Sequence, residues 1–274
     1  MATKLLDGRI AIVTGASAGI GRSIAQDLVE HGARVVVNAR RADKLAELVA
    51  ELSPRDGAGN GAGNGARVVR AVAAAGDASD AGVIESMLGM ARSAFGAEAD
   101  LVVVNAGRGL NGSVVSSDEA QWEEMVRTNI LGTARLMRSA AQAMTGDIQR
   151  RDGGDWKKRA RDIVVIGSVV GRHVSPFSSM YGGTKFAVHG MTEGVRRELA
   201  GRGVRVTLVE PGFVVSEFQG VAGYTAEWFS QMRDKFGPML EPEDVARCIS
   251  FARAQPPQVH VSDILLRPTR QDYP

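Results

Sequence analysis

Short apolar runs alternate with longer helical patterns along most of this chain, and this alternation limits the fold more than any other feature. The apolar runs are rich in valine and isoleucine, which is typical of strands buried on both faces. The expected strands are Ile10–Thr14, Arg34–Asn38, Arg67–Val72, Leu101–Asn105, Ile163–Gly167 and Val204–Val209. The expected helices are roughly Ile20–His31, Ala42–Leu52, Asp80–Phe95, Asp118–Met144 and Tyr181–Ala200. The pattern predicts a parallel sheet with helices on both faces, and right-handed crossovers make it a doubly wound α/β fold.

Two segments interrupt this alternation without ending it. Residues 53–66 contain a glycine-rich repeat that cannot pack a core, which predicts a flexible surface loop. Residues 145–161 are polar and charged, which favours a solvated loop over a basic binding patch. The alternation resumes after each segment, and 274 residues are within the range of one domain. We therefore expect a single domain over residues 1–274, with surface insertions near 53–66 and 145–161.

Composition narrows the class of protein. A formal net charge of +2 gives no electrostatic reason to expect nucleic acid or a membrane as partner. The single cysteine, Cys248, excludes an internal disulfide and fits a reducing compartment. The N-terminus lacks a signal-like apolar region, and no apolar run approaches membrane-spanning length. His31, His189 and His260 show no metal-ligand grouping. We expect a cytoplasmic, metal-independent protein.

The first expected strand runs directly into a glycine-rich turn, and a helical pattern follows. Glycines let the backbone approach a pyrophosphate, and a helix N-terminus supplies free N–H groups and a partial positive charge. The spacing is Gly-x-x-x-Gly-x-Gly, not the commoner Gly-x-Gly-x-x-Gly, so a plain glycine turn that begins a helix is the alternative. The candidate cofactor residues of this turn are Gly15, Ser17, Ala18, Gly19, Ile20 and Gly21.

The end of the second expected strand bears on which dinucleotide would bind. An NAD site often carries an acidic residue here for the ribose hydroxyls. This chain instead has Arg40 and Arg41, which would tolerate a 2′-phosphate and hydrogen-bond to it. Arginine is not favoured at a helix N-terminus, so a phosphate partner gains weight over two surface arginines. The strand end therefore predicts NADP(H), with Arg40 as first choice and Arg41 as second.

A second group of polar residues indicates catalysis. Tyr181 and Lys185 are four residues apart and share one face of an expected helix. A nearby ammonium favours phenolate, so we expect Lys185 to lower the pKa of Tyr181 and make it a proton donor and acceptor near neutral pH. Ser168 ends a strand at the edge of the sheet where ligands bind. Asn129 lies within an expected helix, where asparagine is a mediocre residue. The alternative is a chance position on a surface helix for Tyr181 with Lys185, a helix-cap or turn serine for Ser168, and plain surface exposure for Asn129.

Taken together, these residues resemble a short-chain dehydrogenase/reductase. The matching features occur in the family's order over nearly the whole chain: Thr14–Gly21, Asp77, Asn105-Ala106-Gly107, Asn129, Ser168, Tyr181 with Lys185, and Pro211-Gly212. The strand end at Arg40 and the tail from Leu266 are similar to a subgroup with NADP-dependent 3-hydroxy acid (serine-type) dehydrogenases and clavulanate-type aldehyde reductases. The resemblance implies a single-domain Rossmann fold with a mostly seven-stranded parallel sheet, and a homotetramer or homodimer.

The resemblance also implies a role for each residue. Asn129, Ser168, Tyr181 and Lys185 would form a catalytic tetrad. In it, Tyr181 protonates the carbonyl oxygen, Ser168 orients that oxygen, Lys185 tunes Tyr181 and holds a ribose hydroxyl, and Asn129 positions a water. Asp77, with Ala78 beside it, would meet the adenine amino group. Asn105, Ala106 and Gly107 would lie beside the adenosine ribose and close the cleft, and Pro211 and Gly212 would border the nicotinamide.

The segment after Gly212 would lie over the cleft. Residues 213–218, Tyr224, Trp228, Phe229 and Met232 are a lid that makes a largely apolar pocket or, equally, a helix packed on the core or on another subunit. Arg108, Arg172 and His173 follow cleft-edge motifs and are candidates to hold a substrate carboxylate, or are solvated loop residues.

These features predict an NADP(H)-dependent oxidoreductase that reduces a ketone or aldehyde to an alcohol, or runs in reverse, on a small-molecule substrate. The alternative is a catalytically silent NADP(H)-binding regulatory or scaffold protein on the same fold. The presence of Ser168, Tyr181 and Lys185 together disfavours it. A nucleotide-sugar epimerase or dehydratase is a third hypothesis, which the short chain disfavours.

Overall fold

A single parallel sheet organises the molecule. The structure is a computed structural model and describes residues 4–53, 69–173 and 175–273. Within these residues, seven parallel strands lie in the order β3-β2-β1-β4-β5-β6-β7. Their bounds are β1 Ile10–Thr14, β2 Arg34–Ala39, β3 Ala71–Ala75, β4 Leu101–Val104, β5 Arg161–Ile166, β6 Val204–Pro211 and β7 Asp263–Leu266. The strand order reverses between β1 and β4, which is where ligands bind in such sheets. The predicted doubly wound α/β fold is confirmed.

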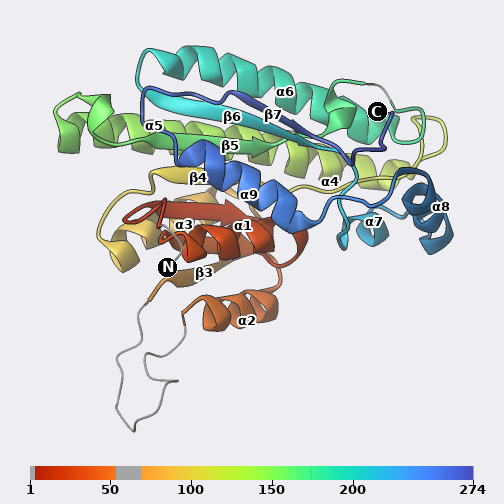
Figure 1. Ribbon diagram of the computed structural model, residues 1–274, viewed down its shortest axis with the longest axis horizontal. Helices are drawn as coiled ribbons and strands as arrows, with labels where there is room; N and C mark the ends of the chain where they lie inside the picture. The colour runs from red at the N-terminus through yellow and green to blue at the C-terminus, as the bar shows by residue number, and fades with distance from the viewer. Residues whose placement is uncertain (1–3, 54–68, 174, 274) are drawn as a thin grey trace, which may run out of the picture.

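Helices cover both faces of the sheet (Figure 1). The α-helices are α1 Gly19–Glu30, α2 Ala42–Leu52, α3 Ala81–Phe95, α4 Trp122–Val126, α5 Thr133–Asp152, α6 Ser179–Ala200, α7 Phe218–Val221, α8 Ala226–Phe236 and α9 Pro242–Arg253. One buried apolar core joins α1, α2 and α9 to the sheet, and a second joins α3, α5 and α6 to the other face. Helices α7 and α8 lie beyond one end of the sheet (Figure 1). In the described part of the chain, no helix is long and apolar enough to cross a membrane.

Two strands differ from the expectation. The third strand covers Ala71–Ala75, because its pairing with β2 sets Ala71 opposite Val35 and Ala75 opposite Ala39, whereas the expected start at Arg67 lies outside the described residues. Pairing with a neighbour outweighs the poor strand propensity of alanine. The last strand, β7, was not among the expected strands because its four residues are too short to give a clear pattern. Most of the predicted loop at 53–66 lies outside the described residues.

The prediction of a solvated loop at 145–161 is wrong for much of that segment. Helix α5 continues to Asp152 and ends where Gly153 takes a left-handed φ of 64°. Asp147 and Asp152 both bind Arg161, whose side chain is completely buried at the start of β5. Some of the charged residues in this segment therefore form a buried ion-pair cluster, which their order in the sequence does not indicate. A short 3₁₀ turn, Trp156–Lys158, leads into β5.

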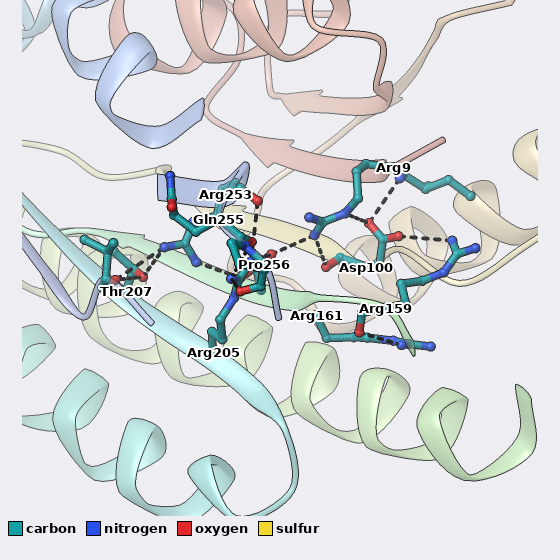
Figure 2. Close-up of polar contacts among 12 residues, drawn as sticks. Arg9, Asp100, Arg159, Arg161, Arg205, Thr207, Arg253, Gln255 and Pro256 are labelled. Atoms are coloured by element: carbon teal, nitrogen blue, oxygen red, sulfur yellow. Dashed lines mark hydrogen bonds and ion pairs between the residues drawn. The ribbon is translucent and has the colours of Figure 1, made fainter. Parts of the chain in front are cut away.

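A second cluster of buried charges ties together the amino ends of the strands (Figure 2). Asp162 on β5 binds Arg9, Arg205 and Arg253, each with an N–O distance of 2.7 Å. Arg9 also binds Asp100, just before β4. Burial opposes ionisation of Asp162, but the three guanidinium groups outweigh it and hold its pKa well below the usual range. These residues lie at the end of the sheet opposite to the glycine turn, so the cluster is a structural element and not part of the ligand edge.

Candidate active site

A cleft of about 790 Å³ opens at the carboxyl ends of the strands. Every predicted cofactor residue lines it, and so do Ser168, Tyr181 and Lys185. The lining cofactor residues are Gly15, Ser17, Ala18, Gly19, Ile20, Gly21, Arg40, Arg41, Asp77, Ala78, Asn105, Ala106, Gly107, Pro211 and Gly212. The fold therefore brings the two predicted ends of the site, nucleotide and catalytic, into one continuous space.

The glycine turn leaves room for backbone to approach a ligand. Gly15 and Gly19 have φ values of 67° and 51°, a region that favours glycine. A Cβ on Gly21 would collide with the carbonyl of Gly15 and the amide of Asn105. Helix α1 begins after Ala18, whose side chain makes no capping hydrogen bond, so the first backbone N–H groups have no side-chain acceptor there. This arrangement fits a pyrophosphate.

Thr14 and Asn105 hold the turn against the neighbouring strand. The Thr14 hydroxyl accepts the N–H groups of Asn105 and Ala106, at 3.0 and 3.1 Å, and donates to the carbonyl of Val103 at 3.2 Å. The Asn105 amide donates to the Thr14 carbonyl at 2.9 Å. In this structure the Asn105 side chain therefore hydrogen-bonds to the turn itself. Thr14 thus helps to form the site. In the sequence it stands only as the first residue of the Thr14–Gly21 match, and its position just before Gly15 is the signal for this role.

Two arginines lie where β2 ends. Arg41 donates to the Ser17 hydroxyl at 3.0 Å and pairs with Glu217 at 2.9 Å. Arg40 pairs with Glu124 at 3.1 Å, and its side chain is 70% exposed. Both arginines are among the residues that line the cleft. The structure therefore collects a hydroxyl and two cations at the strand end where an acidic residue would select NAD.

Asp77 follows β3 and is kept ionised. Its carboxylate accepts the backbone N–H and the hydroxyl of Ser79, at 2.8 and 2.7 Å, and pairs with Arg127 at 2.9 Å. Burial opposes ionisation, but these hydrogen bonds and the guanidinium hold the pKa of Asp77 below its usual value. A carboxylate at the edge of the cleft can accept a hydrogen bond from an amino group, as the adenine role requires.

Tyr181 lines the cleft and is half-buried. Burial raises the pKa of Tyr181, a hydrogen bond with Ser168 opposes that rise, and the neighbouring Tyr224 adds to it. The expectation that Lys185 lowers this pKa is wrong for this structure, because burial penalises phenolate more than its neighbours favour it. Tyr181 therefore keeps its proton at neutral pH, which is the form that donates to a carbonyl oxygen.

Lys185 lies one helical turn from Tyr181 on the same face of α6, as predicted. Its Nζ is 5.7 Å from the centre of the Tyr181 ring and donates to the carbonyl of Ile166 at 2.8 Å. Burial lowers the pKa of Lys185 to about 8. The amine is thus fixed at the end of β5, and it titrates only just above neutral pH.

Asn129 lies behind the wall of the cleft and does not line it. It belongs to a π-helical turn, Arg127–Gly132, that links α4 to α5. Its amide clamps Arg108 by accepting the backbone N–H and donating to the carbonyl, both at 2.9 Å, and it donates to Thr184 at 3.0 Å. A π-helical turn often occurs at functional sites. Asn129 therefore fixes the loop after β4 onto α6, close to Lys185.

The segment after Gly212 covers the substrate end of the cleft. Phe218, the first residue of α7, has its ring 5.6 Å from the ring of Tyr181. A Cβ on Gly109 would collide with Phe218 and Ala222, so glycine at 109 permits the close approach of α7. Trp228 and Met232 of α8 also line the cleft. These contacts favour the lid over a helix packed wholly on the core.

The three candidates for binding a substrate carboxylate are placed differently. Arg172 pairs with Glu210 and lies outside the main cleft, beside His189. His173 is exposed and does not line the cleft. Arg108 does line it, but its guanidinium pairs with Glu124 and donates to Gln121 at 2.6 Å. Arg172 and His173 therefore do not line the cleft, and the alternative of exposed loop residues fits both of them.

Comparison with known proteins agrees with this geometry. A family model for short chain dehydrogenase matches residues 9–225. An uncharacterized oxidoreductase of Staphylococcus aureus (strain MRSA252) is 32% identical over 264 residues, which are 96% of this chain and 99% of the relative. Serine dehydrogenase complexed with NADP⁺ superposes with a TM-score of 0.78 and 27% identity over 96% of both chains. Alcohol dehydrogenase from the archaeon Thermococcus sibiricus, complexed with 5-hydroxy-NADP, has a TM-score of 0.76 and 25% identity over 97% of this chain and 99% of that one. The chain belongs to the short chain dehydrogenase family of oxidoreductases.

Proposed function

We propose that this oxidoreductase uses NADP(H) to interconvert a ketone or aldehyde and the corresponding alcohol, with Tyr181 as general acid and base. One observation carries the proposal most directly. Tyr181, hydrogen-bonded to Ser168 and one turn from Lys185, lines the same cleft as the glycine turn and the two arginines. When bound, the reduced cofactor supplies the hydride that attacks the carbonyl carbon.

The protein side chains handle the proton. Tyr181 keeps its proton because burial raises its pKa, so it can donate that proton to the carbonyl oxygen as the carbon is reduced. The Ser168 hydroxyl, already hydrogen-bonded to Tyr181, can orient the same oxygen. Lys185 is held by the Ile166 carbonyl, and its ammonium stabilises the phenolate left after proton transfer. In the reverse direction the phenolate accepts the proton of the alcohol.

The cofactor preference rests on the end of β2. Arg40 and Arg41 are cationic groups that already bind carboxylates, and Arg41 also donates a hydrogen bond to the Ser17 hydroxyl. A 2′-phosphate can replace Glu124 and Glu217 as their partner, because guanidinium binds phosphate with paired, charge-assisted hydrogen bonds. The NADP-bound relatives support this preference.

Two variants test the proposal. Tyr181→Phe removes only the hydroxyl, so NADPH should still bind, while carbonyl-dependent NADPH oxidation should fall by roughly a hundredfold or more. Unchanged turnover would remove Tyr181 from its role. Arg40→Asp should weaken NADPH binding far more than NADH binding, as measured by cofactor fluorescence titration. An equal effect on both cofactors would overturn the 2′-phosphate assignment.

A further inference from the structure

An apolar stripe of α8 faces the cleft and is only partly covered. Trp228, Met232 and Phe236 follow one another at four-residue intervals, so they share one face of the helix, and all three line the cleft. Within α8, the whole of which is described, only Phe236 is buried. An amphipathic helix normally buries such a stripe against the core. Here its remaining surface is left for whatever occupies the substrate end.

Aromatic rings continue this stripe toward the reacting group. Tyr224 stacks on Trp228, with ring centres 4.4 Å apart, and Phe213 lies 6.0 Å from Trp228. Phe218 reaches the ring of Tyr181 at 5.6 Å. At the mouth, Phe177 and Val221 line the cleft while being 63% and 60% exposed. Apolar surface therefore extends from the proton donor to the rim.

The cations near this surface already have partners. Arg108 is held by Glu124 and Gln121. Lys235 lies over the ring of Phe236, 4.6 Å from its centre, and 3.9 Å from Asp272. A substrate carboxylate would lose its hydration on entering, and Arg108 could bind it only by giving up Glu124 or Gln121, which costs free energy. The pair of Lys235 and Asp272 is exposed and lies at the rim.

We propose that the substrate is a bulky, uncharged carbonyl compound, or its alcohol, with a ring that packs on Trp228 and Met232 beside Tyr181. This inference rests on the proposed function, since it concerns the substrate of the same site. A substrate ring that packs on the stripe would bury the apolar surface of α8 that the protein itself leaves exposed. It gains both apolar burial and ring–ring contacts. It sets this site apart from one that takes a small hydroxy acid.

Four 2-oxo compounds separate ring from charge. Ethyl benzoylformate and benzoylformate share a phenyl ring and differ in charge, whereas ethyl pyruvate and pyruvate carry a methyl group in place of the ring. NADPH oxidation by the full-length protein gives kcat/KM for each. We expect ethyl benzoylformate to exceed both ethyl pyruvate and benzoylformate by roughly tenfold or more.

Variants on one helix tie the preference to the stripe. Trp228→Ala should lower the ratio of kcat/KM for ethyl benzoylformate over ethyl pyruvate by roughly tenfold, while Gln231→Ala, exposed on the same helix and outside the cleft lining, should leave the ratio unchanged. Met232→Arg places a cation in the stripe and should raise benzoylformate relative to its ester. This second variant keeps the test decisive if Trp228→Ala does not fold.

The outcomes distinguish the two proposals. Equal or better turnover of ethyl pyruvate or benzoylformate, or an unchanged ratio in Trp228→Ala, would overturn the substrate class and leave the reductase function standing. Failure of all four compounds to oxidise bound NADPH would count against both.

Discussion

The backbone N–H of Ser168 donates to Nε2 of His189 across a distance of 3.4 Å, so a residue in the middle of α6 supports the turn that carries Ser168. The ring also fills the space beside Gly167 and Gly171, where a Cβ on either glycine would collide with it. On its other side, Nδ1 lies 3.6 Å from the buried carboxylate of Glu210. The proton of the neutral ring therefore belongs on Nδ1, with Nε2 as acceptor.

Replacing His189 should loosen Ser168 without disturbing the nucleotide end. We expect His189→Ala to lower kcat by roughly tenfold, because Ser168 loses both its acceptor and the packing beneath it, and to leave the Kd for NADPH unchanged. His189→Gln offers an acceptor of similar reach and should recover part of the rate. Equal kcat in the wild type and His189→Ala would show that the serine turn is held without the ring.

The same contact gives a pH signature. Burial lowers the pKa of His189; Glu210 and Asp263 oppose this, while Lys185 and Arg172 add to it. The ring is therefore neutral at pH 7 and gains its second proton only at a pH below the ordinary pKa of histidine. The protonated ring can no longer accept the hydrogen bond from Ser168. We expect kcat of the wild type to fall on the acid side, and the fall to be weaker in His189→Gln. Parallel acid limbs in the two proteins would contradict this prediction.

Lys185 should trade stability for activity. Its pKa is about 8 in the folded protein, against 10.5 ordinarily, so the unfolded chain binds more protons between these values and stability rises with pH there. From pH 8 to 9.5 the wild type should gain roughly 1 to 2 kcal/mol from this group. Lys185→Met should lack the gain and also lose turnover. Urea unfolding at pH 8 and 9.5 checks the first effect. An equal change in the free energy of unfolding between these pH values in the two proteins would contradict it.

Local patterns were sufficient to find the residues that follow the strand ends. Gly15, Arg40, Asn105, Ser168 and Gly212 each come within two residues of a strand's carboxyl end, and parallel strands bring those ends to one edge. For the same reason Tyr181 and Lys185, paired by helical spacing, meet Ser168 once α6 packs against β6. Local sequence and the regular topology of the sheet are therefore enough to place these site residues.

The errors concern side chains whose partners are brought beside them only by the fold. Arg172 pairs with Glu210, 38 residues away, and so points away from the main cleft. Asp147 and Asp152 are covered because Arg161 binds both of them. The pKa of Tyr181 is raised by burial in the folded protein, which no spacing in the sequence reports. Each of these depends on a contact that exists only after folding.

Gly109 should control how closely α7 approaches the cleft. A methyl group there would collide with Phe218 and Ala222, so Gly109→Ala should push α7 outward and lower kcat/KM for the carbonyl substrate by roughly tenfold, with NADPH binding unchanged. Gly194→Ala is a matched control, since its Cβ would meet nothing within 4 Å in the exposed face of α6. That change should leave kinetics alone and stabilise the helix by about 0.5 to 1 kcal/mol. Similar kinetic losses in both variants would indicate a general effect of adding a methyl group.

Asp162 should matter for stability and not for chemistry. Asp162→Asn removes the charge that Arg9, Arg205 and Arg253 share, and breaking such a buried cluster should cost about 3 kcal/mol or more. Glu51→Gln, which removes one exposed partner of Arg22, should cost less than about 1 kcal/mol.

The acid dependence of unfolding tests the cause of that cost. The pKa of Asp162 is depressed in the folded protein, so its contribution is complete above the ordinary aspartate pKa and is lost as pH falls through the lower folded value. The free-energy difference between the wild type and Asp162→Asn should therefore be constant from pH 5 to 7 and shrink in stronger acid. Because the cluster lies at the amino ends of the strands, kcat per folded molecule should stay at the wild-type level. A loss of kcat at full folding would connect the two ends of the sheet and contradict the purely structural role.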